Sequence, residues 1–154
     1  MDFEELYRIA SNISKEVILN DKSSFGKVAV ACISEKNNLY TGLSFKTTCN
    51  VGFCAETAVI AQMIIQGETK IKKLVAVYNG NEIVSPCGKC REQLYQLNHD
   101  NIDCQILSNN KVTTLKELLP DYWFWFYFFL ITNTLNGYGL KYFFKFNTIS
   151  IFER

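Results

Sequence analysis

The stretch that decides the fold runs from Cys54 to Tyr78 and reads CAETAVIAQMIIQGETKIKKLVAVY. Its first part predicts a buried helix that ends at Gln66, because apolar residues such as Val59 and Met63 lie four positions apart. Its last part, LVAVY, is apolar throughout and predicts a strand at the centre of a sheet. A helix that leads into a central strand is typical of an α/β fold.

Six further elements are predicted on either side of this stretch. They are helices over Glu4–Leu19, Cys87–Leu97 and Leu115–Leu119, and strands over Val28–Ile33, Leu39–Lys46 and Ile102–Leu107. A short turn separates the first two strands, so we expect an antiparallel hairpin. The later strands alternate with helices, so we expect parallel neighbours joined by right-handed crossovers. The sequence therefore predicts a three-layer α/β/α sandwich around a mixed sheet.

The composition is that of a folded, weakly charged protein. Of the 154 residues, 48% are hydrophobic and 20% are charged, and the formal net charge is +1. A large field of one sign that would attract nucleic acid or an anionic membrane is therefore excluded. The acidic start, Met-Asp-Phe-Glu-Glu, does not resemble a signal peptide, so we expect a cytoplasmic location. In that reducing compartment, clustered cysteines bind metal or do chemistry more often than they form disulfides.

The composition changes after Trp123. Eight of the twelve phenylalanines lie in the last 31 positions, which show no period of 2 or 3.6 residues. We therefore predict one folded domain over residues 1–123 and an aromatic-rich tail outside it over residues 124–154. The longest apolar run, Tyr122–Ile131, is too short to cross a membrane as a helix, which takes about 20 apolar residues. The alternatives for the tail are a contact with a membrane surface and self-association.

Three cysteines have the spacing of a metal site. Cys87 and Cys90 lie three positions apart at the start of a predicted helix, where their thiolates can share one tetrahedral metal. A helix N-terminus also favours thiolate over thiol. Cys54 stands at the start of another predicted helix, and both helices follow strands or loops at the same edge of the sheet. Three sulfur ligands leave a fourth position for water, which distinguishes catalytic zinc from structural zinc.

Glu56 completes this set. It lies two residues after Cys54, so on a regular helix it cannot face the same way, and we expect it to stand beside the metal instead of ligating it. A carboxylate in that position can accept a proton from water and pass it on. Two alternatives stay open at this point. One is a zinc-stabilised binding module without catalysis, and the other is a thiol redox pair formed by Cys87 and Cys90.

The motifs resemble those of a known family. Cys54-Ala-Glu56 and PCGKCREQL over Pro86–Leu94 look like the zinc motifs of the cytidine deaminase superfamily, in the form that acts on free nucleosides. A resemblance to blasticidin-S deaminases in particular is carried by Tyr40-Thr-Gly42, Ser85–Arg91 and Glu117–Pro120. The likeness covers roughly residues 25 to 123 and does not extend into the tail.

The resemblance implies a zinc-dependent hydrolase. One Zn²⁺ per chain would be held by Cys54, Cys87 and Cys90, and Glu56 would carry protons while the 4-amino group of a cytosine-type molecule becomes a carbonyl and ammonia leaves. Arg91 would donate hydrogen bonds to a thiolate and moderate the negative charge of the centre. The family also implies a homotetramer. The three-cysteine ligand set and the lack of a basic stripe argue against nucleic-acid editing.

The predicted substrate contacts depart from the family pattern. Ser44 and Lys46 stand where cytidine deaminases have an Asn and a Glu that grip the ribose. A lysine has no acceptor for a sugar hydroxyl, and a substrate with a carboxylate, as in blasticidin S, suits Lys46 better. By resemblance, Phe25 would stack on the pyrimidine, and Tyr122 and Trp123 would close the pocket.

Overall fold

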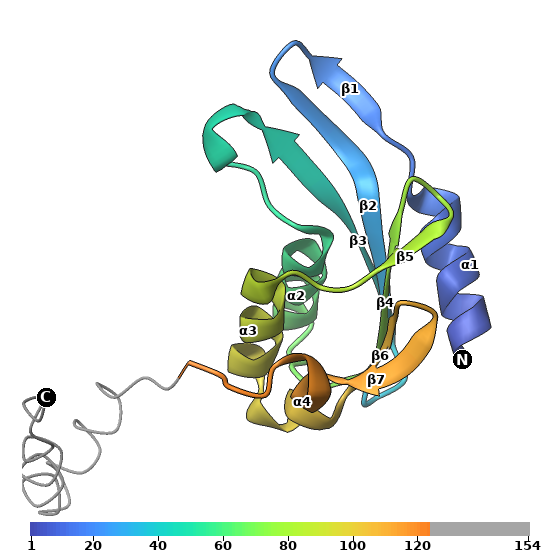
Figure 1. Cartoon of the computed structure of the whole chain (residues 1–154), viewed down its shortest axis with the longest axis vertical. Helices are drawn as coiled ribbons and strands as arrows, with labels where there is room; N and C mark the ends of the chain where they lie inside the picture. Colours follow the sequence, from blue (N-terminus) through green and yellow to red (C-terminus); the bar gives the residue numbers. More distant parts are fainter. Residues whose placement is uncertain (124–154) are drawn as a thin grey trace, which may run out of the picture. The chain divides into compact units, whose positions relative to one another are not determined.

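A mixed sheet of seven strands forms the centre of the molecule (Figure 1). The computed structural model describes residues 1–123, and the predicted tail over residues 124–154 lies outside them, so the predicted domain boundary stays a prediction. The helices are α1 (Phe3–Ile13), α2 (Ala55–Ile65), α3 (Gly88–Leu97) and α4 (Leu115–Leu118), with 3₁₀ turns η1 (Thr48–Asn50) and η2 (His99–Asp103). The strands are β1 (Val17–Asn20), β2 (Ser23–Ser34), β3 (Leu39–Thr47), β4 (Ile71–Tyr78), β5 (Glu82–Val84), β6 (Gln105–Ser108) and β7 (Lys111–Thr114).

The sheet has the mixed topology that the sequence predicts. Its strand order is β1-β2-β4-β6-β7, with β3 paired to β2 and β5 paired to β4. The hairpin of β2 and β3 is antiparallel, whereas β4 and β6 are parallel neighbours joined through α3. The central position predicted for β4 is confirmed, because it pairs with β2, β5 and β6.

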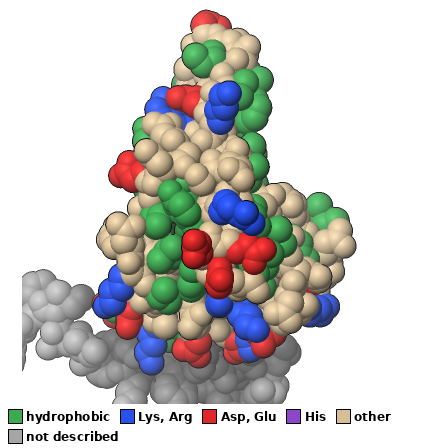
Figure 2. All heavy atoms as spheres, turned by 90° about the vertical axis from the view of Figure 1, so that its right-hand side faces the viewer, with side chains coloured by type: hydrophobic (Ala, Val, Ile, Leu, Met, Phe, Trp, Pro, Cys, Tyr) green, Lys and Arg blue, Asp and Glu red, His purple; other side chains and the backbone are tan. Residues whose placement is uncertain are grey.

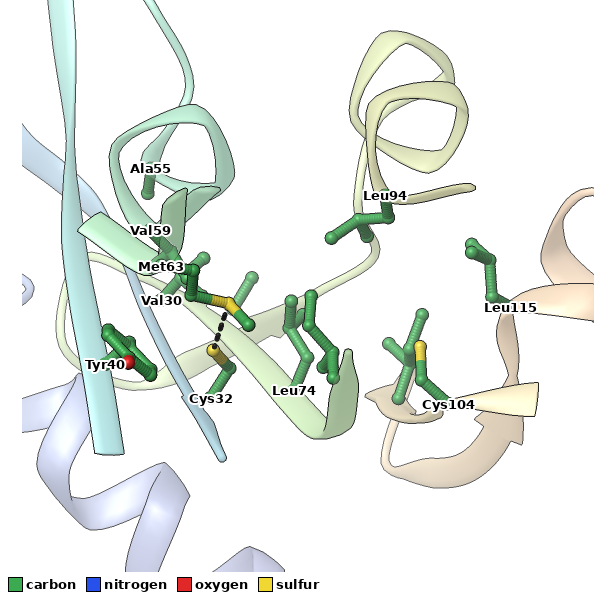
Figure 3. Close-up of a cluster of buried hydrophobic side chains, with 13 residues drawn as sticks. Val30, Cys32, Tyr40, Ala55, Val59, Met63, Leu74, Leu94, Cys104 and Leu115 are labelled. Atoms are coloured by element: carbon green, nitrogen blue, oxygen red, sulfur yellow. Dashed lines mark hydrogen bonds between the residues drawn. The ribbon is translucent and has the colours of Figure 1, made fainter. Parts of the chain in front are cut away.

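Helices cover both faces of the sheet, which confirms the three-layer architecture (Figure 1). Alternate residues of a strand point to opposite faces, so Ala31 and Val75 pack with Leu6 and Ala10 of α1. Their neighbours in sequence pack on the other side against α2, α3 and α4. Figure 3 shows this second core, to which α2 contributes Ala55, Val59 and Met63, α3 contributes Leu94, and α4 contributes Leu115.

The first predicted helix was wrong in its last residues. It ends at Ile13, and Val17–Asn20 form strand β1, which pairs antiparallel with β2. The cause is Ser14, whose hydroxyl donates to the Val77 carbonyl at 3.0 Å and accepts the Gly80 N–H at 3.2 Å. These contacts tie the end of the helix to β4, and the β-branched residues that follow are better suited to a strand.

Two short strands, β5 and β7, were missed by the sequence analysis, and β6 begins later than predicted. Asn101 explains the late start, because its buried amide donates to the carbonyls of Thr69 and Leu94 and accepts the Ile71 N–H. These three hydrogen bonds hold residues His99–Asp103 in the 3₁₀ turn η2. The capping box that opens α4 is confirmed, with Thr114 and Glu117 bonded in both directions.

The surface on the side of α1 carries acidic and basic side chains mixed with apolar ones (Figure 2). This mixture agrees with the small net charge of the chain. Within residues 1–123, none of the helices has the length and apolar character needed to span a membrane.

Candidate active site

A cavity of about 360 Å³ lies where β3 approaches the N-termini of α2 and α3. Apolar side chains and polar or charged side chains line it together, as in small-molecule sites. The apolar lining comes from Val28, Phe45, Phe53, Ala55 and Val84, and the chemically active lining from Cys54, Glu56, Cys87 and the two lysines Lys46 and Lys89.

Two helix N-termini bring three sulfur atoms together. Cys54 precedes the first turn of α2, Cys87 precedes the first turn of α3, and Cys90 lies within that turn. Neither Cys54 nor Cys87 uses its side chain to cap its helix, so both sulfurs remain available to a ligand. The Sγ atoms of Cys87 are 3.9 Å from Cys54 and 3.4 Å from Cys90, and all three lie within 4.8 Å of one another.

This cluster fits a zinc ion. Tetrahedral zinc with Zn–S bonds of about 2.3 Å holds its sulfur ligands about 3.8 Å apart. The separations of 3.4 and 3.9 Å lie on either side of that value. Three thiolates at one point, at two helix N-termini, are also the soft anionic donor set that zinc prefers. Cys54, Cys87 and Cys90 can therefore hold zinc with small adjustments.

Close backbone contacts position Cys54. A Cβ atom at Gly42 of β3 would overlap the carbonyl oxygen of Ala55, so only glycine lets the strand lie this close to the start of α2. The segment just before the helix is held by two backbone hydrogen bonds of 2.9 Å between Phe45 and Phe53. The start of α2 is thus fastened to β3 on one side.

A side-chain hydrogen bond fastens it to α3 on the other. The Thr57 hydroxyl of α2 donates to the Gln93 side-chain oxygen of α3 at 2.9 Å. Because each helix supplies sulfur atoms to the same cluster, this bond helps to hold the two N-termini in register.

The three thiols differ in acidity. Burial raises the pKa of Cys54 and Cys90, and the nearby carboxyl of Glu56 raises that of Cys90 further. Burial acts on Cys87 in the same direction, but hydrogen bonds from the backbone N–H and side chain of Cys90 and from Cys54 outweigh it and lower its pKa. Cys87 is therefore the thiol of the cluster that ionises most readily.

The other buried cysteines are unsuited to this chemistry. Burial raises the pKa of Cys32 and of Cys104 to about 12, so both stay protonated at neutral pH. Cys32 packs with its sulfur 4.0 Å from that of Met63 in the core (Figure 3). These two thiols act as core residues.

Glu56 lines the same cavity from the first turn of α2. Its side chain is nearly enclosed, with 4% exposure, and this burial raises its pKa against the opposing effect of hydrogen bonds from its own backbone N–H and from Cys90. A raised pKa makes the carboxylate a stronger base, which suits a group that accepts a proton and returns it. The catalytic role of Glu56 stays a prediction.

Arg91 has partners that the sequence did not indicate. Its Nε donates to the Pro86 carbonyl at 2.7 Å, and its Nη1 donates to the Leu118 carbonyl at 2.9 Å. Among the hydrogen bonds of residues 1–123, none joins Arg91 to a sulfur. These two hydrogen bonds connect the loop before Cys87 to the end of α4. The predicted contact of Arg91 with a thiolate stays a prediction.

The predicted substrate contacts separate into two groups. Ser44 and Lys46 line the cavity, as expected if they meet a substrate. The Ser44 hydroxyl accepts the Val28 N–H at 3.0 Å, at a point where the pairing of β2 with β3 shifts register.

Phe25, Tyr122 and Trp123 do not line this cavity. Phe25 lies opposite Phe45 in the hairpin, and Tyr122 contacts the Tyr95 ring with centroids 4.2 Å apart. Trp123 is 60% exposed. Their roles in substrate binding stay predictions.

Several residues that line the cavity were not predicted from the sequence. They include Val28, Phe45, Phe53 and Lys89. A signal was present for two of them, because Phe53 directly precedes Cys54 and Lys89 stands between Cys87 and Cys90. The others reach the site only through strand pairing.

These features define an α/β protein with a candidate metal site at two neighbouring helix N-termini. Residues 2–105 match the family described as the cytidine and deoxycytidylate deaminase zinc-binding region. This chain belongs to that family. A relative from Mycoplasma genitalium, a cytidine deaminase, is 32% identical over 101 residues, which cover 62% of this chain and 78% of the relative.

Solved structures share the fold. The cytidine deaminase from Mycobacterium tuberculosis is similar with a TM-score of 0.68 and 22% identity, over 81% of this chain and 99% of that one. The cytidine deaminase from Burkholderia pseudomallei gives a TM-score of 0.62 and 17% identity, over 80% and 100% of the two chains. At these identities the likeness concerns the fold alone.

Proposed function

We propose that this protein is a zinc-dependent hydrolytic deaminase of a small cytosine-type molecule. Water adds to C4 of the ring, the 4-amino group leaves as ammonia, and a carbonyl remains. One observation carries the proposal: three sulfurs within 4.8 Å of one another share a cavity with a nearly enclosed carboxyl, Glu56. Membership of the deaminase family and the cytidine deaminase from Mycoplasma genitalium support it.

One zinc per chain is part of the proposal. Cys54, Cys87 and Cys90 would hold it, and when bound it supplies a Lewis acid that lowers the pKa of water to about 7. The low pKa of Cys87 relative to an ordinary thiol favours metal binding, because only the thiolate is a ligand.

Glu56 would move the protons. Its carboxylate accepts a proton from the attacking water and delivers it to N3 of the ring, which makes C4 more open to attack. A second proton then passes through the same carboxyl to the departing amine. The apolar side chains of Phe45, Phe53 and Val84 line the cavity around this exchange.

The substrate is proposed to be blasticidin S or cytidine and deoxycytidine. The family supports a cytosine ring. Lys46, which lines the cavity, favours a substrate with a carboxylate, and Ser44 can hydrogen-bond a polar group of either kind. We further propose a homotetramer, by resemblance, and a cytoplasmic location, which the six free cysteines support.

An ammonia-release screen tests the proposal. Zinc-loaded protein is offered cytidine, deoxycytidine, cytosine and blasticidin S, and the same screen is run with Glu56→Gln and with Glu82→Gln, an exposed carboxyl of β5. We expect release with at least one substrate, a loss of roughly 10²- to 10⁴-fold in Glu56→Gln with zinc retained, and little change in Glu82→Gln. Bound zinc without ammonia release from any substrate would instead indicate a binding module.

A further inference from the structure

Strand β1 lies at one edge of the sheet. It pairs antiparallel with the first half of β2 and stands at the end of the strand order β1-β2-β4-β6-β7. In the part of the chain that the structure describes, no strand pairs with its other side. Figure 1 shows the hairpin of β1 and β2 extending beyond the helices. The backbone N–H and C=O groups on the free side of such a strand can pair with another strand.

All four side chains of β1 are exposed, although three of them are large and apolar. Val17 is 41% exposed, Ile18 is 77% exposed and Leu19 is 55% exposed. The strand at the opposite edge, β7, differs, because Val112 is its only large apolar residue. Exposed apolar edge strands are where chains pair with one another, so β1 has the character of a contact surface.

Two charged side chains flank this apolar run. Lys15 precedes it and Asp21 follows it, and both are exposed. Neither takes part in an ion pair within residues 1–123. The neighbouring acid differs, because Glu16 accepts the Ser24 hydroxyl at 2.9 Å and pairs with Lys27 at 3.3 Å. Lys15 and Asp21 can therefore pair with charges of another molecule without the loss of an ion pair within the chain.

The segment is complementary to its own reverse. In an antiparallel pair of two β1 strands centred on Ile18, the two Ile18 side chains lie opposite each other and Val17 lies opposite Leu19. Lys15 of one copy is then brought beside Asp21 of the other, and the two-fold axis repeats this pair at the far end. Apolar contacts in the middle and opposite charges at both ends are the cross-strand pairs that stabilise a sheet.

Two other registers fit less well. A register with Ile18 opposite Leu19 brings Lys15 to Lys22, and like charges across a strand pair are destabilising. A register centred on Leu19 brings Lys22 to Glu16, whose carboxylate is already paired within the chain. The distribution of charge therefore favours the register centred on Ile18.

We propose that β1 is a self-association surface, on which the β1 strand of a second copy of this chain pairs antiparallel around a two-fold axis at Ile18. The contact is short, because β1 has four residues and its pairing with β2 shifts register between Ile18 and Asn20. It also closes on itself, because each copy uses its one β1 strand. None of residues 15–21 lines the cavity with the sulfur cluster, so the inference does not depend on the proposed reaction.

Analytical ultracentrifugation of the zinc-loaded full-length chain tests the surface. Ile18→Glu should halve the mass of the assembly, because two carboxylates would meet on the axis. The Ile18 side chain is exposed, so the fold of each copy should be unchanged. The matched control is Val112→Glu in β7, at the opposite edge, which should keep the wild-type mass. A mass that Ile18→Glu leaves unchanged, or that both variants lower alike, overturns the inference.

A charge exchange tests the register. Lys15→Asp and Asp21→Lys should each raise the dissociation constant of the contact by roughly fivefold, because like charges then meet at both ends. The double variant should return the constant to near the wild-type value, since the ion pairs form again with reversed polarity. A concentration series in the ultracentrifuge measures the three constants. Losses that simply add in the double variant overturn the proposed pairing.

A disulfide gives direct evidence of the axis. Residues opposite each other in an antiparallel pair have Cβ atoms about 4.5–5.5 Å apart, which is close to the reach of a disulfide. In Ile18→Cys, air oxidation with a copper catalyst should remove two hydrogen atoms from the two new thiols and join the copies. Peptide mass spectrometry distinguishes this link from any link at the six native cysteines. Val112→Cys is the control. No link between the two copies of position 18, or one formed equally at position 112, overturns the inference.

Discussion

The cavity joins two regions that are built in different ways. Its floor consists of the N-termini of α2 and α3, where Cys54, Glu56, Cys87 and Cys90 come from two short segments. Its wall is the second half of β3, where Ser44 and Lys46 are placed by pairing with β2. The groups proposed for chemistry thus depend on local helix geometry, whereas those proposed for substrate choice depend on the register of a hairpin.

The hairpin register is irregular at the point that matters. Phe25 pairs with Phe45, but the next pair along is Ala29 with Leu43, so β2 holds extra residues there. Gly26 within this bulge has φ of +81°, a left-handed conformation that favours glycine. A change in this bulge can therefore alter which side chains of the hairpin meet a substrate.

The largest expected effect separates floor from wall by removing a sulfur. Cys87→Ser should abolish stoichiometric zinc binding and all ammonia release, because two remaining thiolates hold zinc poorly. Zinc content by atomic spectroscopy and the ammonia assay measure it. Cys49→Ser, an exposed cysteine outside the cluster, is the control and should keep both properties. Full activity in Cys87→Ser would rule out the proposed metal centre.

A smaller effect is expected from a substitution of Arg91, whose hydrogen bonds hold the loop before Cys87. Arg91→Gln loses the hydrogen bonds to the Pro86 and Leu118 carbonyls, so the loop before Cys87 is held less firmly. We expect zinc affinity to fall by roughly 10- to 100-fold, as for other outer partners of metal ligands. Competition with a zinc chelator measures the affinity.

The conservative change sharpens the same test. Arg91→Lys keeps the positive charge but cannot reproduce two hydrogen bonds in a fixed fork, so it should behave like Arg91→Gln. If Arg91→Lys kept the wild-type zinc affinity, the contribution of Arg91 would be its positive charge near the thiolates. Its hydrogen bonds to the Pro86 and Leu118 carbonyls would then matter little.

Gly42 lies where β3 meets the start of α2, so a substitution there should affect both the stability of the fold and the binding of zinc. In Gly42→Ala the new methyl group would meet the Ala55 carbonyl oxygen and the Val59 side chain, which forces β3 away from α2. We expect a loss of about 1–3 kcal/mol in the free energy of unfolding, together with weaker zinc binding. Urea denaturation and chelator competition measure the two. Gly88→Ala is the matched control for stability, since a Cβ there meets no atom within 4 Å.

The same difference explains what could be predicted from the sequence. The helix from Ala55 to Ile65 and the strand from Ile71 to Tyr78 follow from local periodicity, and the sulfur cluster follows from the spacing of its cysteines. The short strands β5 and β7 carry little pattern of their own and exist because they pair with β4 and β6. Val17 continues the apolar spacing of the first helix, so periodicity alone placed it there, although contacts of Ser14 with β4 end that helix.

The site shows the same limit. The partners of Arg91 are backbone carbonyls at Pro86 and Leu118, which any sequence would supply, so only the fold could reveal them. Lys89 was visible between its cysteines, but the fold alone shows that it lines the same cavity as Lys46. The spacing of residues in the sequence predicts which side chains of one segment lie together. It does not predict which side chains of different segments meet in the fold.

The smallest expected effect lies in the wall. Ser44→Ala removes the acceptor of the Val28 N–H within the bulge, while leaving the helix N-termini unaltered. We expect the free energy of unfolding to fall by about 1 kcal/mol, because a half-buried N–H loses its partner. Zinc affinity should stay within error of the wild-type value, whereas KM should rise more than kcat falls. Ser23→Ala, in the paired strand β2 and outside this cavity, is the control for kinetics. Equal losses in KM, kcat and zinc affinity would show that floor and wall are one cooperative unit, and the distinction between them would then have to be abandoned.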